Sequence, residues 1–434
     1  MHKRIILLSC CLITTQTFAA GFYNDSQSVS ALGNAFAGAG AAGDDASIMF
    51  YNPAGLTLID DTQLVLSGIY ALPDVVLTVT HAEDSFGNPL PEAVGQEYSA
   101  IPDEIIPAFY FAKPINEDFV LGMSVTSPFA AVTDYPNDSL VKATAIQTSF
   151  ITYTANLTLA MQATEQLSLG VGVNAQYFKV KMNAAIWETG TQGSILGEYQ
   201  GDDVAFYPNF GALYQLTERT RLGLNYRMQV QHETQGDFTL YDTIDNPPAT
   251  LPFPASSTFI LPDIVSLNLF HEVTRNIEFL ADVTFTHWDT LQSIAVSTGQ
   301  PIFGGGTSTP VDSHINFKNA WRAGVGANYI WSPEIKLRTG VAYDESPIVD
   351  ETRTLQGPDS NRVEVAVGMM YKPRGWEQTH FDIGYMHTFF ADAIVAQTNP
   401  LFAVFPRLEF AGITSTGYFN SSADFIGAQI VHSM

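Results

Sequence analysis

The sequence predicts an all-β fold, a 14-stranded antiparallel transmembrane β-barrel, and three observations support this prediction. Charged residues make up only 15% of the chain and apolar residues 46%, whereas a soluble domain usually carries about 25% charged residues. From about residue 62 onward, apolar and polar residues alternate with a period of two, which is typical of strands with one apolar face. The connections between these strands are alternately short and long, as in outer-membrane barrels.

Residues 1–19 predict a secretory signal peptide. Lys3 and Arg4 supply the positive charge, residues 5–13 form a short apolar stretch, and Thr17-Phe18-Ala19 fits a cleavage site of small residues. We expect cleavage near Ala19. The alternative is a buried N-terminal strand or helix.

Composition excludes several classes of function. Both cysteines, Cys10 and Cys11, lie in the predicted signal, so the mature chain should have no disulfide and no cysteine-ligated metal. The formal net charge of −25 at pH 7 argues against nucleic acid as a partner, because nucleic-acid binding needs basic patches. Beyond the signal, no apolar stretch is long enough to predict a transmembrane helix. We predict no cofactor and no metal.

Residues 20–61 differ from the rest of the chain because they lack alternation. Residues 32–40 are rich in small side chains, and Pro53 and Gly55 favour turns. We predict a compact segment of short helices and loops that can pack inside another structure. A flexible leader is the alternative.

The remaining chain divides into strands and sorted connections. The predicted strands are 62–80, 104–113, 117–127, 147–163, 166–183, 203–216, 219–233, 262–273, 276–288, 316–330, 334–345, 361–373, 377–390 and 423–434. The long connections are 81–103, 128–146, 184–202, 234–261, 289–315, 346–360 and 391–422. A soluble sheet has no reason to sort its connections by length, whereas a closed barrel satisfies every backbone polar group in lipid.

Several segments resemble the FadL-type outer-membrane transporters of long-chain fatty acids and other hydrophobic compounds. The resemblance starts at Ala20-Gly21-Phe22, continues through Leu32-Gly33-Asn34-Ala35 and Asn52-Pro53-Ala54, and is densest across 338–347. It covers essentially the whole mature chain. No single motif is decisive, but their order and spacing are specific.

The resemblance implies that residues 20–61 form a hatch inside a barrel of residues 62–434, with Asn52-Pro53-Ala54 as its signature turn and gate. It also implies that cargo leaves sideways at an inward kink of the third strand, which here ends at Ser127-Pro128-Phe129. Proline cannot donate a ladder hydrogen bond, so it suits a bend. A plain strand-to-loop boundary is the alternative.

Strand parity predicts charged side chains in the lumen. If the apolar faces point to lipid, the inward residues of the tenth to twelfth strands include Lys318, Arg322, Arg338, Asp344, Arg362 and Glu364. One Lys or Arg can bind a fatty-acid carboxylate, and each buried CH₂ adds roughly 0.8 kcal/mol. The headgroup candidates are therefore Lys318 and Arg362, with Asp344, Arg322 and Lys179. Pairing among these charges is the alternative. The parity of Lys179 points to lipid, so it lies either above the aromatic girdle beyond Tyr177 or at a bulge that turns it inward.

Apolar residues in two long connections suggest a capture groove. They are Leu251 and Phe253 in one connection, and Leu401 and Phe402 in the last one. Exposed apolar clusters often mark binding grooves. The alternative is that they pack together and stiffen the loops.

The sequence thus predicts an outer-membrane protein of a Gram-negative bacterium that takes up long-chain fatty acids by passive diffusion. The alternatives are uptake of uncharged aromatic or aliphatic hydrocarbons, a surface adhesin or structural barrel, and an enzyme. No nucleophile elbow, zinc motif or phosphate loop supports an enzyme. The expected partners are hydrophobic small molecules, outer-membrane lipid and lipopolysaccharide, and the barrel assembly machinery. We expect a monomer.

Overall fold

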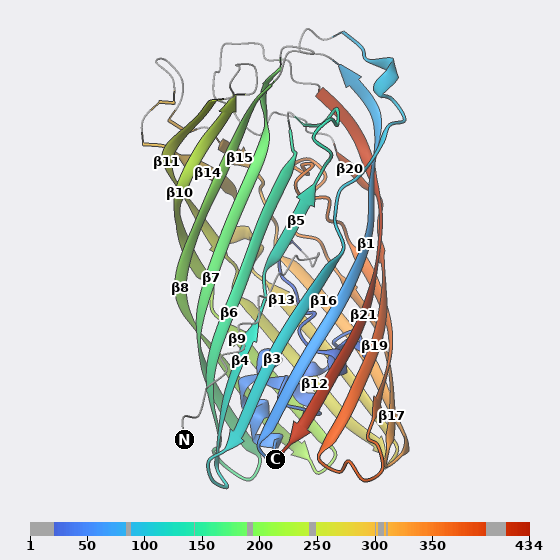
Figure 1. Ribbon diagram of the computed structural model, residues 1–434. Coiled ribbons are helices and arrows are strands. Elements are labelled where there is room, and N and C mark those ends of the chain that lie inside the picture. Colours follow the sequence, from blue (N-terminus) through green and yellow to red (C-terminus); the bar gives the residue numbers. More distant parts are fainter. Residues whose placement is uncertain are drawn as a thin grey trace, which may run out of the picture.

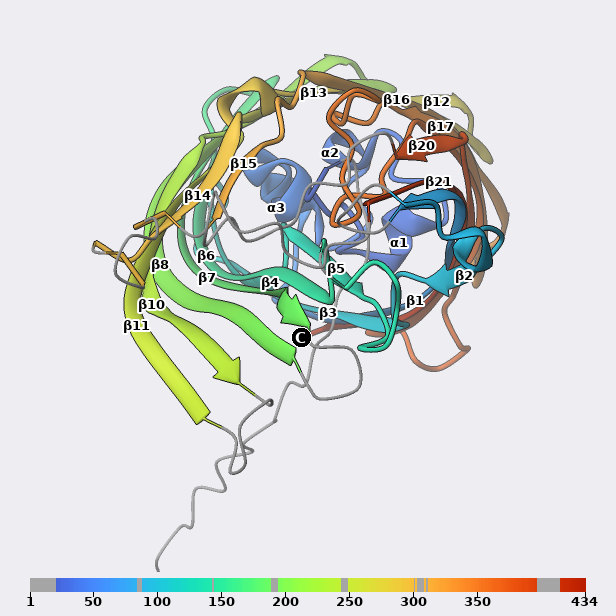
Figure 2. The same ribbon diagram turned by 90° about the horizontal axis from the view of Figure 1, so that it is seen from above.

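The computed structural model describes residues 21–83, 88–142, 144–188, 194–242, 249–299, 301–302, 308–309, 311–395 and 414–434. They form a closed antiparallel barrel whose lower half is filled by the N-terminal segment (Figures 1 and 2). The predicted fold class is therefore confirmed. The predicted signal peptide lies outside the described residues.

Fourteen strands build the wall. In chain order they are β1 (Gln63–Glu83), β3 (Glu104–Pro114), β4 (Phe119–Thr126), β6 (Gln147–Gln162), β7 (Leu167–Glu188), β8 (Ser194–Thr217), β9 (Thr220–Arg227), β12 (Ile264–Thr274), β13 (Ile277–Thr286), β16 (Ala320–Ser332), β17 (Ile335–Asp344), β18 (Arg362–Tyr371), β19 (Thr379–Phe390) and β21 (Thr414–Ser433). The barrel closes between β1 and β21, whose register runs from Gln63 opposite Ser433 to Glu83 opposite Thr414.

Seven shorter or upper strands extend this wall at the end with the long connections. They are β2 (Glu97–Ser99), β5 (Ala130–Asp134), β10 (Val230–Asp242), β11 (Ala249–Leu261), β14 (Ser293–Ser297), β15 (Val311–His314) and β20 (Ala393–Val395). Two predicted long loops are consequently wrong. Most of 184–202 belongs to the β7–β8 ladder, and most of 234–261 is the β10–β11 hairpin.

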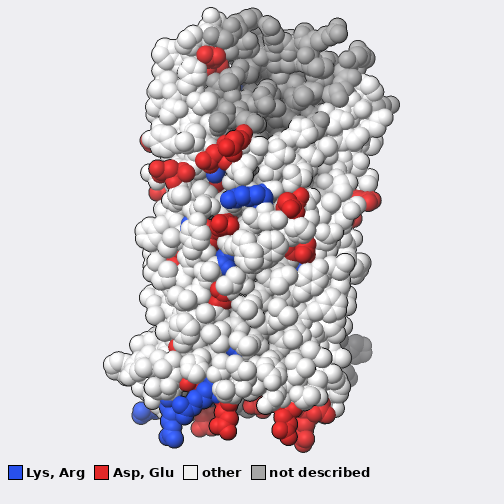
Figure 3. Space-filling model, turned by 180° about the vertical axis from the view of Figure 1, so that it is seen from behind, with Lys and Arg blue, Asp and Glu red and all other residues white. Residues whose placement is uncertain are grey.

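Alternation places apolar side chains on the outside of the wall. Leu66, Val325 and Ile383 are each about half exposed, whereas their neighbours in sequence are more buried. Figure 3 shows that charged residues gather at the lower rim and leave the wall just above it almost free of charge. This outer surface suits contact with lipid. None of the described helices is long and apolar enough to cross a membrane.

The hatch consists of four short helices inside the barrel: α1 (Val29–Leu32), α2 (Ala39–Ala42), α3 (Ile48–Tyr51) and the 3-10 helix η1 (Pro53–Leu58). It docks against a ring of wall glycines, which we call the glycine belt. At each of them an added Cβ would come within 3.1 Å of a hatch atom. The belt comprises Gly122, Gly170, Gly211, Gly223, Gly340, Gly368, Gly384 and Gly427. At Gly170, Gly223, Gly340 and Gly368 the nearest hatch atoms belong to the backbone, so the hatch backbone lies directly on the wall there.

In the described ladders, the wall is interrupted between β3 and β5. β3 pairs with β4 only over residues 109–114, and β5 pairs with β6. Residues 104–108 of β3 pair with β1 alone in the described ladders. Pro107 lies in this free edge, where its missing N–H costs no ladder bond. We call this place the wall break.

Candidate ligand-binding lumen and its hatch

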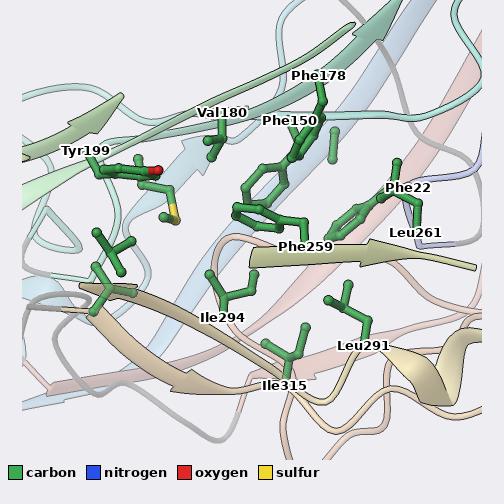
Figure 4. Packing of buried hydrophobic residues seen from close by; sticks show 14 of the residues in the cluster. Phe22, Phe150, Phe178, Val180, Tyr199, Phe259, Leu261, Leu291, Ile294 and Ile315 are labelled. Atoms are coloured by element: carbon green, nitrogen blue, oxygen red, sulfur yellow. The ribbon is translucent and has the colours of Figure 1, made fainter. Parts of the chain in front are cut away.

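A large apolar cluster fills the lumen above the hatch, and we call it the lumen cluster. It is built by residues of β5–β8, β10–β12 and β14–β16, of the connections between them, of the kink and of the hatch; Figure 4 shows part of it. Phe22, from the first described residues of the hatch, lies at its centre. The Phe22 ring is 5.1 Å from that of Phe150, 5.6 Å from that of Trp288 and 5.7 Å from that of Phe317. Such tilted and edge-on contacts are the favoured geometries of aromatic pairs.

The lumen cluster encloses little free space. The cavity next to Phe22 and Phe150 has a volume of only about 40 Å³, which holds no more than a few water molecules, since one water needs roughly 10–15 Å³ of such volume. Apolar Ile294, Ile315 and Ile348 line it, together with hydroxyl groups such as that of Thr148. A long alkyl chain can therefore enter only if side chains such as Phe22 move.

The hatch arm, residues 22–27, pairs with the kink that follows β4. The amide of Ala130 donates to the Phe22 carbonyl at 2.7 Å, and the amide of Asn24 donates to the Pro128 carbonyl at 2.8 Å. Tyr23 and Phe129 form an antiparallel bridge. The arm thus acts as an additional short strand on the inner side of the kink.

The predicted kink residues turn into the lumen. Ser127 and Phe129 are both 2% exposed, and Phe129 joins the lumen cluster. The Gln27 side chain holds this turn, because its Nε2 donates to the Ser127 carbonyl at 2.9 Å and its Oε1 accepts from the Ser127 amide at 3.0 Å. The hydroxyl of Tyr110 on β3 in turn donates to the Gln27 carbonyl at 2.8 Å. Hatch, kink and β3 therefore meet below the wall break.

A buried acid lies at the upper side of the same break. Glu104 is the first residue of β3 and is 1% exposed. Within the described part of the chain, neither of its carboxyl oxygens has a hydrogen-bond partner. A buried polar group without a partner is costly, and a charged one more so. The sequence placed Glu104 at the start of an apolar strand, but parity alone did not single it out.

The Asn52-Pro53-Ala54 turn lies at the bottom of the hatch. The Asn52 Oδ1 accepts from the Ala54 amide at 3.1 Å, as expected for a residue that precedes a helix. Its Nδ2 donates to the carbonyls of Gly40 in the hatch and Ala212 in β8. The turn is thus tied to both the hatch and the wall. Its predicted role as a gate stays a prediction.

The charged residues that parity placed in the lumen form what we call the arm network. Arg322 contacts Asp25 at 3.3 Å, Asp282 at 3.1 Å and Glu364 at 3.2 Å. Arg362 contacts Asp344, and also Asp359 at 3.1 Å. The Gly21 amide donates to Asp359 at 3.0 Å. Two bases thus face five acids, and Asp25 of the hatch arm and Gly21 just before the arm are attached to this network.

Two acids of the hatch, Asp25 and Asp44, have pKa values that are shifted in opposite directions. Burial, together with the nearby Glu364 and Asp344, raises the pKa of Asp25 to about 7 against the pull of Arg322. Burial would also raise the pKa of Asp44, but Lys336 at 2.7 Å and Arg338 at 3.2 Å hold it well below its usual range. Asp44 therefore stays ionised and anchors the hatch firmly, whereas Asp25 is charged only towards neutral pH.

Several predicted site residues lie elsewhere. The inward placement of Lys318 is wrong: its side chain is exposed, because residues 315–319 are irregular and Asn316 has a positive φ of 47°. Lys179 is also exposed on the outer face of β7. Leu251 and Phe253 belong to strand β11 and not to a loop, and only Phe253 packs against the lumen cluster. Leu401 and Phe402 lie outside the described residues.

Sequence reasoning did not single out the buried base Arg227. Arg227 ends β9 and is 4% exposed. Its Nη2 donates to the Phe50 carbonyl of the hatch at 3.0 Å, and its guanidinium lies 4.5 Å from the centre of the Phe50 ring. The alternation of β9 placed Arg227 on the polar face, which was the only available signal.

The chain is thus a hatch-plugged outer-membrane β-barrel with an apolar lumen, a class built to pass hydrophobic molecules. It belongs to the family described as outer membrane protein transport protein (OMPP1/FadL/TodX), whose sequence profile matches residues 10–430. The resemblance found in the sequence is therefore confirmed.

Individual relatives agree with this assignment. The long-chain fatty acid transport protein of Escherichia coli O6:H1 is 27% identical over 424 residues, which cover 89% of this chain and 91% of that protein. Outer membrane protein P1 of Haemophilus influenzae is 27% identical over 400 residues, covering 82% and 83%.

Solved structures share the fold. A FadL homologue from Pseudomonas aeruginosa has a TM-score of 0.83 at 21% identity and covers 95% of this chain and 100% of that one. The toluene transporter TodX of Pseudomonas putida has a TM-score of 0.68 at 16% identity, with 96% and 99% covered.

Proposed function

We propose that this protein takes up long-chain fatty acids across the outer membrane by passive diffusion. The observation that carries the proposal is the lumen cluster, an apolar interior into which Phe22 of the hatch packs. Similarity to proteins named as long-chain fatty acid transporters supports the choice of cargo. Each CH₂ that moves from water into this cluster gains roughly 0.8 kcal/mol.

The route follows from the positions of the hatch arm and the wall break. Cargo enters from the end with the long connections and takes the place of Phe22 in the lumen cluster. Because the arm pairs with the kink through Phe22 and Asn24, its withdrawal frees the inner side of residues 127–130. Cargo then leaves sideways between β3 and β5, where the described ladders leave the wall unpaired. A concentration gradient drives this movement.

The hatch-gate role of Asn52-Pro53-Ala54 and cleavage near Ala19 are parts of this proposal. So are monomeric insertion by the barrel assembly machinery, contact with lipopolysaccharide, and the absence of enzymatic activity. The arm network is assigned to holding the arm and not to the cargo headgroup. Its two bases are already outnumbered by acids, so a carboxylate would be repelled there.

Uptake of uncharged hydrocarbons is the second candidate. The dense aromatic rings of the lumen cluster favour it, because such a surface suits any apolar molecule. Both candidates use the same route and differ in whether a charged headgroup is recognised.

Uptake of labelled oleate decides between the two candidates. A strain that lacks its own fatty-acid uptake protein should gain oleate uptake when it expresses this chain. The same strain with the empty vector serves as the control. Unchanged oleate uptake together with restored growth on toluene or an alkane would replace the first candidate by the second. Hydrolysis of phospholipid by the purified protein would overturn both.

A further inference from the structure

Arg227 differs from the other deeply buried arginines of the barrel interior. Arg322, Arg338 and Arg362 each contact at least two carboxylates within 3.5 Å. For Arg227, no ion pair is found within the described ranges, although it is 4% exposed. Its hydrogen-bond partners are the Phe50 carbonyl at 3.0 Å and the Tyr207 hydroxyl at 3.5 Å. A buried charge without a counter-charge is costly.

The Tyr207 hydroxyl also has hydrogen-bonding capacity left. It accepts from Arg227 and, at 3.3 Å, from the Nε2 of Gln176. Within the described part of the chain its own proton has no acceptor. The Oε1 of Gln176 lies 3.0 Å from the Nε2 of the buried His232, whose Nδ1 lies 3.0 Å from Asp203. This chain of contacts fixes Gln176 and therefore the orientation of Tyr207. One negatively charged acceptor could therefore bind both the guanidinium of Arg227 and the hydroxyl of Tyr207.

The pair lies between the lumen cluster and the hatch. Tyr207 is a member of the lumen cluster, and Phe50 belongs to the separate apolar cluster around α3 and η1. A molecule whose tail occupies the lumen cluster could therefore bring a headgroup to Arg227 without leaving the apolar interior.

We propose that Arg227 and Tyr207 form the carboxylate subsite for the bound fatty acid. The Phe50 carbonyl occupies this subsite when no cargo is present. A carboxylate brings a full negative charge and two acceptor oxygens, so it binds the guanidinium more strongly than a neutral carbonyl does. Cargo therefore takes Arg227 from the hatch, and binding loosens the contact between β9 and α3. The proposal rests on the proposed function and specifies how its cargo is recognised.

Arg221 on the same strand provides a matched control. Its Nε donates to the Ala41 carbonyl at 3.0 Å and its Nη2 to the Ala42 carbonyl at 2.6 Å. Its guanidinium lies 4.1 Å from the centre of the Phe270 ring, and it too has no ion pair in the described residues. Arg221 thus repeats the contacts of Arg227 with the hatch and with an aromatic ring. Phe270, however, lies in a different apolar cluster from Tyr207.

The test compares binding of oleate and of oleyl alcohol to the purified full-length barrel in detergent. The two ligands share a tail and differ in the charged headgroup. We expect the unmodified protein to prefer oleate by about tenfold or more, the ratio that one good hydrogen bond to a charged group provides. In Arg227→Gln this preference should disappear while the affinity for oleyl alcohol stays the same. Arg221→Gln should keep the preference.

The outcomes separate the two proposals. If the unmodified protein binds neither ligand, the proposed function fails. If it binds both and Arg227→Gln retains the preference for oleate, the subsite is wrong while the proposed function stands. Tyr207→Phe removes only a hydroxyl and covers the case that Arg227→Gln does not assemble, which heat-dependent electrophoretic mobility reports. It should reduce the preference by severalfold, and an unchanged preference in Tyr207→Phe overturns the subsite.

Discussion

The amide of Ala130 donates a hydrogen bond to the carbonyl of Phe22 at 2.7 Å. This contact joins the first strand residue after the kink to the residue at the centre of the lumen cluster. The same residue therefore closes the interior and covers the inner side of the wall break. Entry of cargo and opening of a lateral exit are thus linked through one short arm.

Replacement of Phe22 by alanine should create a void at the centre of the lumen cluster. Loss of a buried phenylalanine usually costs about 3–5 kcal/mol when the void stays empty. Because the tail of oleate can fill the void, oleate should stabilise Phe22→Ala more than it stabilises the unmodified protein. The midpoint of heat unfolding, followed by electrophoretic mobility with and without oleate, measures this. Phe279→Ala on the outer face of β13, where Phe279 is 38% exposed, should show a smaller loss and no additional effect of oleate.

A methyl group in the glycine belt should dislodge the hatch. At Gly340 an added Cβ would lie 1.9 Å from the Asn34 carbonyl oxygen, so backbone would have to shift. We expect Gly340→Ala to lose about 1–3 kcal/mol of stability, as for other overpacked sites, and to conduct ions through planar bilayers. At Gly68 a Cβ would meet nothing within 4 Å, so Gly68→Ala should behave like the unmodified protein. Equal conductance of the two variants would contradict this account of the belt.

The hatch arm should be held less firmly as the pH rises towards neutrality. The pKa of Asp25 is raised to about 7 by burial and by nearby acids, despite Arg322. The folded state therefore binds the proton more tightly than the unfolded chain, whose value is near 3.8. Stability from this group is complete below pH 4 and decreases up to about pH 7. Asp44 has the opposite pH dependence, because its pKa is lowered in the folded state. Its contribution to stability is complete at neutral pH and is lost only when the pH falls below the ordinary aspartate range.

A cysteine at position 26 can report this change. The two native cysteines lie in residues 1–19, so Ser26→Cys adds the only thiol that follows the predicted signal. Ser26 is 4% exposed in the arm. Its alkylation, corrected for the reactivity of a free thiol, should increase between pH 4 and pH 7. The additional change Asp25→Asn should make the corrected rate independent of pH, and a persisting increase would show that Asp25 is not the group responsible.

The sequence predicted the inward or outward placement of charged side chains correctly where the strands are regular. Parity placed Arg322, Asp344 and Arg362 inside, and they are buried there. It failed for Lys318, because the residues before β16 are irregular and have no parity to extend. The prolines in 234–261 wrongly suggested a loop. Pro252 and Pro254 lie in β11, which pairs with β10 along one edge and with β14 only at residues 256–257 along the other. Strand edges with few ladder partners tolerate proline.

The candidate site was harder to predict than the fold. Which carboxylate meets which base depends on contacts between hatch and wall, such as Asp25 with Arg322, and no local pattern encodes them. That a buried base lacks an acidic partner, as Arg227 does in the described structure, is even harder to predict from the sequence. The sequence showed Arg227 as one more polar residue of an alternating strand, and only its surroundings distinguish it from Arg322.

Glu104 and Glu364 should respond to the same substitution with opposite signs. Both are inward glutamates of the wall and nearly fully buried, at 1% and 4% exposed. Glu364 contacts Arg322 at 3.2 Å and Arg362 at 3.5 Å, so Glu364→Gln should lower the unfolding temperature, because it weakens two buried charge-assisted contacts to guanidinium groups. Glu104 has no partner in the described structure, so Glu104→Gln should raise that temperature, by an amount equivalent to about 1–2 kcal/mol. The heat-dependent mobility assay checks both variants.

A destabilised Glu104→Gln would mean that the carboxyl has a partner at the wall break, such as a bound cation or a polar group of the cargo. Because functional sites often retain such costly groups, a stabilised variant with slower oleate uptake would place Glu104 on the exit route.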